Sequence, residues 1–336
     1  MKILFLRFSS IGDIVLTTPL YRCVRQQLPD AEIHVLTKEA FRPVLSANPN
    51  IDRIHTFEKE VKEILPALVE EKYDYVADLH HNLRSLQVKR ALNVSKTYSF
   101  PKLNIEKWLL TNLRINLLPD KSIVERYFET LKPLGIRNDG QGLDYVIPEK
   151  EKTRQDDLPF GHWAGFVGCV IGGSYETKKF PAHQWMALCH LLPYPVVLLG
   201  GKEDRELAEI ITATHPGKIY NACGKFSLNE SADLVRRSRV VVTNDTGLMH
   251  IAAAFRKPII SLWGNTAPEF GMFPYYGFNN HQERVAPQSV IVERKDLSCH
   301  PCSKIGYSHC PKGHFKCMNS LDVAGIAQAV AEKWSL

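Results

Sequence analysis

The sequence has no long apolar run and no segment of strongly biased composition. No stretch of 18 consecutive apolar residues occurs among its 336 residues, so we expect no transmembrane helix. Tandem repeats and low-complexity tracts are also absent, which argues against solenoid and disordered architectures. The 42 Lys and Arg residues exceed the 36 Asp and Glu residues by a net charge of +6. This mild positive charge suits an anionic substrate or an anionic membrane face and predicts no nucleic-acid partner.

Several familiar motifs are missing as well. The chain has neither a Walker A pattern nor a G-x-G-x-x-G fingerprint, so the best-known nucleotide-binding loops have no support. It also lacks the G-x-S-x-G elbow of α/β hydrolases, which disfavours a hydrolase built on Asp245, His250 and a serine.

The N-terminal segment "MKILFLRFSSIGDIVLTTPL" has some features of a secretory signal. Arg7 and Asp13 interrupt its apolar region and no A-x-A cleavage pattern follows, so we expect a buried first strand instead. The protein is then expected to be cytoplasmic, with its eight cysteines mostly reduced.

Strands and helices alternate in both halves of the chain, which predicts α/β domains with parallel sheets. In the first half we expect strands at 2–7, 31–37 and 73–79, helices at 14–28 and 82–92, and a further element at 121–136. In the second half we expect strands at 163–173, 194–201, 218–224, 239–244 and 257–264, and helices at 182–192, 202–212, after Ser227 and at 246–255. The polar stretch 137–162 is the predicted linker, and 322–336 is a predicted amphipathic helix.

The segment "VVTNDTGLMHIAAAF" (241–255) changes abruptly from a β-branched run to an apolar helix. In a doubly wound sheet, ligands lie beyond the carboxyl ends of the strands, where the N-termini of the following helices favour phosphate. His250 follows Thr246 by one helical turn and can reach the same site. The structural alternative is that Asn244 or Asp245 only caps the helix, with His250 packed in the core.

Two other strand-to-helix turns have similar chemistry. "IGGSYETKKFPAHQW" (171–185) combines glycines, hydroxyls and the lysines Lys178 and Lys179, and it predicts a diphosphate cradle. "RFSSIGD" (7–13) follows the first strand. There Asp13 is either a helix cap or a general base that faces the cleft.

Four of the cysteines lie close together near the C-terminus, at Cys299, Cys302, Cys310 and Cys317. A C-x-x-C pair is typical of zinc sites, although the second pair is widely spaced and nearby histidines offer competing ligands. Reduced thiols, a structural zinc site and disulfides all remain open.

Taken together, these segments resemble the lipopolysaccharide heptosyltransferase family, glycosyltransferase family 9. "RFSSIGDIVLTTP" is similar to the opening segment of the family, "TKKFP" to its lysine motif, and "TNDTGLMHIAAA" to its most specific signature. The resemblance continues through "LLGGKEDRELAEII", "PIISLWGNTAPE" and "CHPC…CPKGHFKCM". Phe180 stands where a tryptophan is common and Thr246 where serine is frequent, and both changes are conservative.

The resemblance implies a GT-B fold, with two Rossmann-like doubly wound domains that face a central cleft. Residues 1–155 would bind the acceptor, residues 156–320 would bind the nucleotide sugar and end in the Cys-rich segment, and residues 321–336 would form a C-terminal helix. The implied reaction moves heptose from ADP-heptose to a sugar hydroxyl of the lipopolysaccharide inner core, with inversion at the anomeric carbon. The implied acceptor is of lipid A and Kdo type and carries carboxylates and phosphates.

Carried over to this sequence, the resemblance assigns Asp13 as the catalytic base. The implied donor-binding residues are Ser174, Thr177, Lys178, Glu203, Asp204, Asp245, Thr246, Gly247 and His250. The candidate acceptor-binding residues are Arg7, Ser10, Gly12 and Arg84, with Lys89, Arg90 and Arg126 as further cations. No D-x-D motif occurs, so we expect no catalytic metal and no cofactor apart from the ADP-sugar donor and the candidate structural zinc.

Residues 103–119, "LNIEKWLLTNLRINLLP", mix Trp108 and leucines with basic side chains. This composition suits peripheral contact with the inner face of the cytoplasmic membrane, although we expect most of the leucines to pack in the core. Two alternatives to the heptosyltransferase interpretation remain. One is a GT-B transferase or epimerase that uses another nucleotide sugar, and the other is a non-catalytic protein that binds a nucleotide sugar or a lipid.

Overall fold

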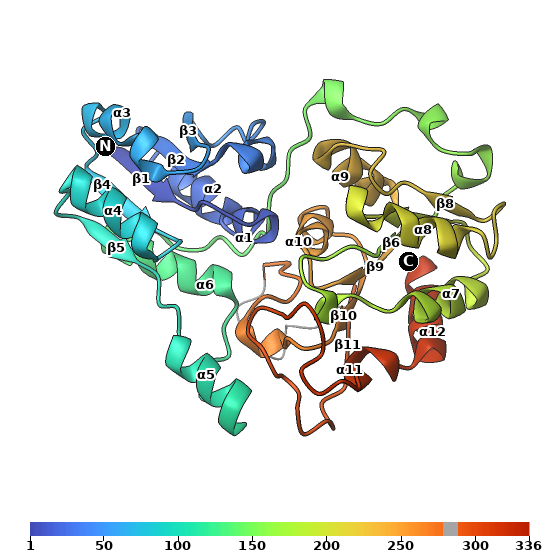
Figure 1. Ribbon diagram of the computed structural model, residues 1–336. Coiled ribbons are helices and arrows are strands. Elements are labelled where there is room, and N and C mark those ends of the chain that lie inside the picture. The colour runs from blue at the N-terminus through green and yellow to red at the C-terminus, as the bar shows by residue number, and fades with distance from the viewer. Residues whose placement is uncertain (278–287, 336) are drawn as a thin grey trace.

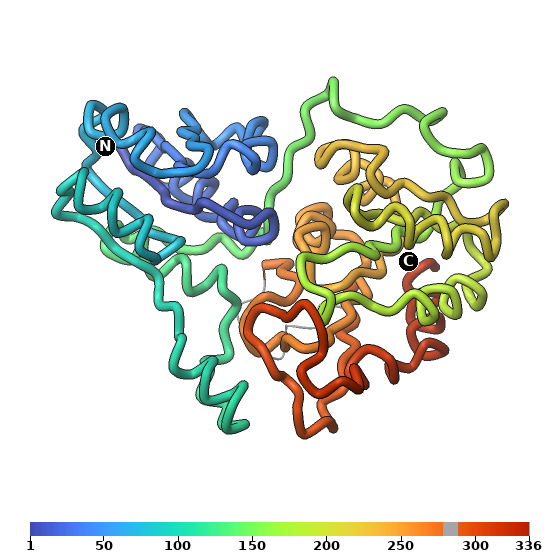
Figure 2. Tube along the Cα trace, viewed as in Figure 1, coloured from blue at the N-terminus to red at the C-terminus, as the bar shows by residue number. Residues whose placement is uncertain are grey.

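The computed structural model describes residues 1–277 and 288–335, which form two α/β halves joined by a long connection (Figure 1). Each half contains one fully parallel sheet, as the alternation in the sequence predicts. The connection, residues 135–166, contains no α-helix or strand and passes from one half to the other (Figure 2). It includes the predicted linker, whereas the predicted boundary at residue 155 remains a prediction.

The first sheet has the strand order β3-β2-β1-β4-β5. Its strands are β1 (Lys2–Leu6), β2 (Glu32–Lys38), β3 (Arg53–Phe57), β4 (Tyr75–Asp78) and β5 (Thr97–Ser99). The α-helices of this half are α1 (Ile11–Val15), α2 (Thr18–Gln27), α3 (Leu65–Glu70), α4 (Leu83–Leu92), α5 (Asn104–Leu113) and α6 (Ile123–Phe128). Short 3-10 helices are η1 (Glu39–Val44), η2 (Val61–Glu63) and η3 (Glu129–Leu134), with η4 (Glu149–Glu151), η5 (Gln155–Asp157) and η6 (Phe160–His162) in the connection.

The second sheet has the order β11-β10-β9-β6-β7-β8. Its strands are β6 (Val167–Val170), β7 (Val196–Leu199), β8 (Ile219–Asn221), β9 (Val240–Asn244), β10 (Ile259–Trp263) and β11 (Ser289–Glu293). Its α-helices are α7 (Ala182–Leu191), α8 (Arg205–Thr212), α9 (Leu228–Arg237), α10 (Gly247–Ala254), α11 (Lys316–Asn319) and α12 (Val323–Trp334). The 3-10 helices here are η7 (Glu176–Lys178), η8 (Lys202–Asp204) and η9 (Pro268–Phe270).

Both faces of each sheet are buried, because helices cover them on both sides. In β1, Ile3 and Phe5 join one apolar cluster, whereas Leu4 and Leu6 join another on the opposite face. The first of these clusters continues into the second half of the chain through residues of α10 such as Ile251. The two halves therefore share a continuous apolar contact close to the carboxyl ends of β1 and β9.

The predicted helix at 14–28 is wrong in one respect, since it divides into α1 and α2. The break falls at residues 16–17, where Thr17 and Thr18 turn their hydroxyls onto the carbonyls of Ile14 and Val15. Pro19 follows in the first turn of α2 and has no N–H with which to continue the hydrogen-bond ladder. The capping box predicted at Ser227 is confirmed at the start of α9. The predicted C-terminal helix corresponds to α12, and residue 336 lies outside the described residues.

The expectation that most leucines of residues 103–119 pack in the core is wrong, because one of the six leucines is buried, three are partly buried and two are exposed. Leu110 is buried, but Ile105, Trp108 and Leu117 are 74%, 54% and 61% exposed. Helix α5 projects from the first half and lies away from its sheet (Figure 1). None of the helices within residues 1–277 and 288–335 is both long and apolar enough to cross a bilayer.

Candidate active site

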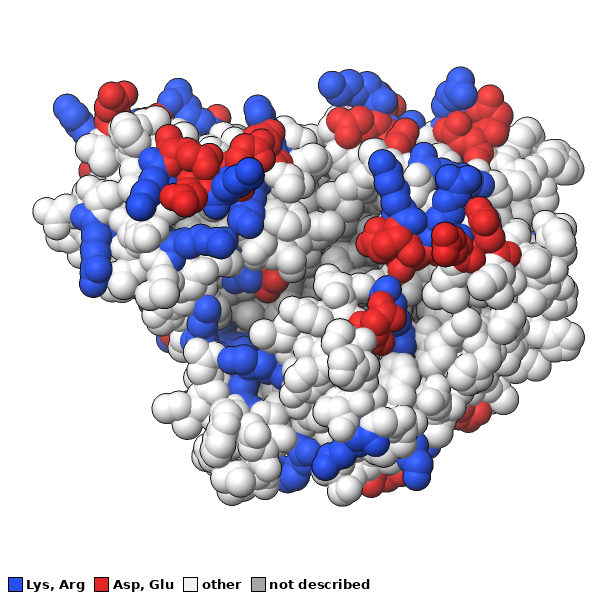
Figure 3. Space-filling view, viewed as in Figure 1, with Lys and Arg blue, Asp and Glu red and all other residues white. Residues whose placement is uncertain are grey.

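A cavity of about 420 Å³ lies between the two halves. Its walls come from the segments that follow β1, β4, β5, β6, β9 and β10, where parallel strands present their carboxyl ends. β1 and β4 are the neighbours at which the strand order of the first sheet reverses, and β6 and β9 are those of the second. Each half therefore presents its topological switch point, the usual ligand position of an open α/β sheet, to the same cavity. Figure 3 shows the hollow between the halves.

Asn244, the last residue of β9, joins the two cavity-lining loops that follow β6 and β9. Its side-chain amide donates towards the carbonyls of Val170, Ile171 and Gly172, at 3.1–3.3 Å, and its oxygen accepts from the backbone N–H of Phe180 at 3.1 Å. Asn244 is fully buried. It therefore fixes the glycine-rich turn after β6 against the end of β9, and it does not cap the following helix.

Helix α10 begins at Gly247, and its N-cap residue Thr246 makes no side-chain capping bond. The first N–H groups of this helix are therefore not capped by the Thr246 side chain, and Thr246 and Gly247 line the cavity. Free N–H groups and the positive end of the helix dipole form an anion-binding site. The Ser174 hydroxyl and Gly173 line the same part of the cavity.

Lys178 and Asp245 form an ion pair at the cavity wall. The Lys178 ammonium lies 2.6 Å from Asp245 Oδ2, which also accepts a hydrogen bond from Thr266 Oγ1 at 3.0 Å. Its neighbour Lys179 instead pairs with Glu176 and Asp204. The sequence does not distinguish the two lysines, but the structure does, because Lys178 lines the cavity and Lys179 does not.

Asp13 lies opposite, on the first half. Its Oδ1 is 2.6 Å from an Arg7 guanidinium nitrogen, and its Oδ2 accepts from the Ser10 hydroxyl at 2.8 Å and the Ser10 N–H at 3.2 Å. Burial alone would raise the pKa of Asp13, but Arg7 and the Ser10 hydrogen bonds outweigh burial and lower it. The carboxylate is therefore ionised at neutral pH and held in one orientation. Arg7 is nearly buried and also donates to the carbonyls of Ser9 and Leu79.

Two glycines allow the halves to approach each other beside Asp13. A Cβ on Gly12 would lie 2.5 Å from His250 Cδ2, and a Cβ on Gly247 would lie 2.8 Å from Ile11 Cβ. Helices α1 and α10 therefore pack backbone to backbone. Burial lowers the pKa of His250 to about 4, so its ring is neutral, and Nδ1 finds no hydrogen-bond partner among the described residues.

The structure adds a group of cations that the sequence motifs do not predict. Lys102, Lys107 and Lys304 line the cavity beyond Asp13. Burial, with Arg126 and Lys304 nearby, lowers the pKa of Lys107 to about 7, and burial is also the main cause that lowers the pKa of Lys102. In Figure 3, Lys and Arg side chains gather on the wall of the hollow beside α5. No short motif marks these lysines, since Lys102 and Lys107 lie in one segment and Lys304 comes from the distant Cys-rich segment, so that all three meet only in the fold.

Some predicted site residues lie outside the cavity lining. Thr177 is buried, and its hydroxyl both accepts from the Tyr307 N–H at 2.8 Å and lies 3.1 Å from the Tyr307 carbonyl. Asp204 is also buried, where it accepts from the Gly201 N–H and pairs with Lys179. Both side chains support the loops rather than facing a ligand. Glu203 and Arg84 are exposed, and neither is among the lining residues.

The Cys-rich segment contributes to the cavity, and the structure bears on the three alternatives that the sequence leaves open for its cysteines. All eight cysteines are free thiols, and burial raises the pKa of Cys302 and takes that of Cys317 to about 12. Within the described chain, one set of three or more His, Cys, Asp or Glu ligand atoms lies within 4.8 Å of one another, and it contains no cysteine. Zinc at the cysteines therefore has no support. The segment instead brings Lys304 to the cavity.

An ionised carboxylate on one Rossmann-like half and a lysine with an open helix N-terminus on the other can activate a hydroxyl and stabilise a departing diphosphate. Fold and site together define a glycosyltransferase of the GT-B class. More specifically, the chain belongs to glycosyltransferase family 9 (heptosyltransferase), whose family model matches residues 61–307.

Relatives and solved structures agree with this family. The chain is 28% identical over 301 residues to lipooligosaccharide heptosyltransferase 2 of Haemophilus influenzae, covering 80% of this chain and 85% of that protein. The structure of Escherichia coli ADP-heptose lps heptosyltransferase II matches with a TM-score of 0.73 at 22% identity, over 99% of this chain and 98% of that one. E. coli heptosyltransferase WaaC with ADP matches with a TM-score of 0.69 at 20% identity, over 99% and 100%. The predicted family, the GT-B fold and the heptosyltransferase class of activity are confirmed.

Proposed function

We propose that this protein transfers heptose from ADP-heptose to a sugar hydroxyl of the lipopolysaccharide inner core, with inversion at the anomeric carbon. The observation that carries the proposal is that Asp13 faces the Lys178 and α10 cradle across one cavity, from opposite halves of the chain. A passive binding protein has no need of an ionised base in this cavity, and an epimerase has no need of a second substrate beside that base. The names of the relatives, which include E. coli WaaC solved with ADP, support ADP-heptose as the donor.

The diphosphate of the donor would lie against the α10 N-terminus and Lys178. The contacts described for Asp245 all use Oδ2, so Oδ1 is placed to accept a hydroxyl of the heptose while Oδ2 holds Lys178 in position. Ser174, Thr246 and Gly247 complete the cradle. We assign the ribose contact to Glu203 rather than Asp204, because Asp204 is buried and already paired.

In the transfer step, the acceptor hydroxyl oxygen bonds to the anomeric carbon as the bond to the diphosphate oxygen breaks. The leaving electron pair stays on ADP, where Lys178 and the helix N–H groups stabilise it. The hydroxyl proton passes to Asp13. A carboxylate of lowered pKa is a weak base, so it takes the proton late, once the new bond has made that proton acidic. Attack from the side opposite the leaving group inverts the anomeric centre.

The cations beyond Asp13 would bind the acceptor. Lys102, Lys107 and Lys304 lie in a partly buried cavity, where unpaired ammonium groups are costly until an anion arrives. Kdo carboxylates and lipid A phosphates provide such anions. Among the cations predicted from the sequence, Arg7 is engaged with Asp13 and Lys89 with Asp78, so these two act mainly on protein groups.

We further propose that α5 and the segment after it rest on the anionic inner face of the cytoplasmic membrane. Ile105, Trp108 and Leu117 are exposed there, beside the lysines of the cavity, and an anionic leaflet complements both features. The acceptor lipid would then reach the cavity from the leaflet. Sedimentation with vesicles tests this: phosphatidylglycerol vesicles should retain the protein, and Trp108→Ser should weaken binding. Phe160→Ser, a control in the connection whose side chain is even more exposed than that of Trp108, should not. Equal binding by both variants contradicts the membrane contact.

Calorimetric titration with ADP, UDP and GDP, each with and without EDTA, tests the donor assignment. We expect selective ADP binding that survives EDTA. Lys178→Ala should weaken it about 10- to 100-fold, because a charge-assisted contact is worth roughly 1.5–3 kcal/mol. Lys179→Ala is the matched control, because this lysine pairs with Glu176 and Asp204 and should leave ADP affinity unchanged. Preference for UDP or GDP would overturn ADP-heptose as the donor.

A further inference from the structure

A second group of polar side chains lies in the first half, away from the catalytic cavity. His34 is the third residue of β2, and His55 is the third residue of β3. Glu71 directly follows α3. The register pairs His34 with Arg53, two residues before His55, so both imidazoles project from the same face of the sheet. The cavity lies at the carboxyl ends of these strands, whereas Glu71 contacts Lys2, the first residue of β1, at the opposite end of the sheet.

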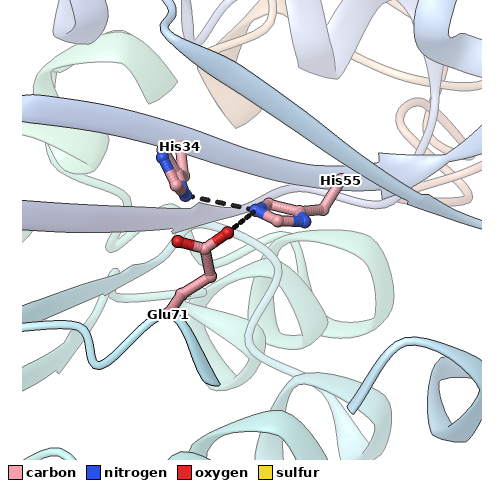
Figure 4. Close-up of side chains that lie close together, drawn as sticks. All are labelled: His34, His55 and Glu71. Atoms are coloured by element: carbon pink, nitrogen blue, oxygen red, sulfur yellow. Dashed lines mark hydrogen bonds and ion pairs between the residues drawn. The ribbon is translucent and has the colours of Figure 1, made fainter. Parts of the chain in front are cut away.

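The ligand atoms of these three residues converge on one point (Figure 4). One atom of each residue lies within 4.8 Å of the others. His34 Nδ1 is 3.1 Å from His55 Nε2, and His55 Nε2 is 3.8 Å from Glu71 Oε1. Two nitrogen or oxygen ligands of a metal ion, each about 2.0–2.1 Å from it, lie about 3 Å apart. The spacing is therefore close to that of a coordination sphere.

Glu32 fixes the proton of His34 on the far side of the ring. His34 Nε2 lies 2.8 Å from Glu32 Oε1. A carboxylate can only accept, so Nε2 carries the proton and donates it. The lone pair of a neutral His34 is then on Nδ1, which points at His55 and Glu71. A carboxylate that orients a histidine in this way is the usual support of a metal-binding imidazole.

One neighbouring cation, Arg53, has to leave Glu71 for an ion to bind. Arg53 bonds to Glu71 Oε1, whereas Lys2 takes the other oxygen, Oε2, at 2.6 Å. The Arg53 side chain is 58% exposed, so it can leave Glu71 for water at little cost. Tyr73 OH lies 3.0 Å from His34 Nδ1 and 3.1 Å from His55 Nε2. In the ion-free protein its hydroxyl links the two rings, and its oxygen is a fourth polar atom near the three converging ligand atoms.

We propose that His34, His55 and Glu71 form a binding site for a divalent transition metal, with zinc as the best match. Two imidazoles and one carboxylate are a common zinc ligand set. Bound metal would tie β2, β3 and the end of α3 together at the end of the sheet remote from catalysis. Its effect should therefore be on the stability of the first half rather than on the transfer reaction.

Zinc binding to the full-length protein tests the site directly. Cysteine thiolates compete for zinc, so the measurements use a C299S/C302S background and a colorimetric chelator as competitor. We expect one zinc ion per chain and a higher melting temperature with zinc than with EDTA. His55→Ala should weaken binding at least 100-fold, and Glu32→Gln, which loosens His34, about 10- to 100-fold. His183→Ala, an exposed histidine on α7, is the matched control and should bind as the parent does.

Arg53→Ala should change zinc affinity in the opposite direction. Removing the cation that occupies Glu71 should tighten zinc binding. Circular dichroism in EDTA would show whether His55→Ala fails to fold. In that case Glu32→Gln and Arg53→Ala still test the site, because Glu32→Gln should weaken zinc binding and Arg53→Ala should strengthen it. Absence of zinc from the parent, or binding that neither variant changes, overturns the proposal.

Discussion

Replacing Gly12 by alanine should separate transfer from donor binding. The added Cβ would lie 2.5 Å from His250 Cδ2 and 3.3 Å from the Gly247 Cα. Carbon atoms in contact prefer about 3.5–4.0 Å, so the two helices have to move apart by roughly 1 Å. Asp13 is the next residue along α1, and it moves with that helix relative to the cradle.

A displacement of about 1 Å in a reacting group costs on the order of 100-fold in rate. We therefore expect kcat to fall about 100-fold in Gly12→Ala. Overpacking costs about 1–3 kcal/mol of stability, and the better helix propensity of alanine returns about 1 kcal/mol. The variant should remain folded. ADP affinity should change little, because the cradle belongs entirely to the second half.

The assay measures heptose transfer, ADP affinity by calorimetry and thermal unfolding on the same preparation. Gly161→Ala is the control, because a Cβ there meets nothing within 4 Å, and it should behave as the parent does. Transfer by Gly12→Ala at the parent rate would refute the close-contact argument. A loss of ADP affinity as large as the loss of rate would refute the proposal that the second half alone binds ADP while the first half supplies the base.

Three further predictions concern charge at the cavity. Ser10→Ala removes a hydrogen bond that lowers the pKa of Asp13, so that pKa should rise and the acid limb of the kcat/KM profile should move to higher pH. Lys107, with its pKa near 7, loses its charge as the pH rises through neutrality, so the KM for an anionic acceptor should increase from pH 6 to pH 8; Lys107→Arg should flatten this dependence, because arginine stays charged. Lys304→Ala should raise the acceptor KM about 10-fold, the worth of one charge-assisted contact, and leave the KM for the donor unchanged. A rise in both KM values would contradict its place on the acceptor side.

The sequence predicts the elements whose residues follow a simple period. β1, β7 and β9 are apolar on both faces, and the predicted strands lie close to their observed bounds. β6 is also found, but it is much shorter than the predicted strand at 163–173. β3, which reads "RIHTF", and the short β5 are not predicted, because polar side chains interrupt the apolar pattern. The break between α1 and α2 depends on threonine hydroxyls that turn onto the backbone, which a count of apolar positions does not detect.

The site residues are predictable from the sequence where all residues of a recognisable motif lie within one loop. Thr246, Gly247 and Lys178 stand in such loops, and the fold brings them to one cavity. Thr177 stands beside the lining residue Lys178 but is buried, and Asp204 is buried as well, and their positions in the loops give no sign of this. Trp108 is ambiguous for another reason: apolar residues at helical spacing look alike whether they face a core or solvent.

The direct test of the account is transfer by Asp13→Asn, measured with ADP-heptose and a lipopolysaccharide acceptor beside ADP affinity for the same protein. Asparagine keeps the shape of the side chain but cannot accept the hydroxyl proton. The account predicts a fall in kcat of about 10²- to 10⁴-fold with ADP binding unchanged. Transfer within a few-fold of the parent would contradict Asp13 as the base and, with it, the proposed mechanism.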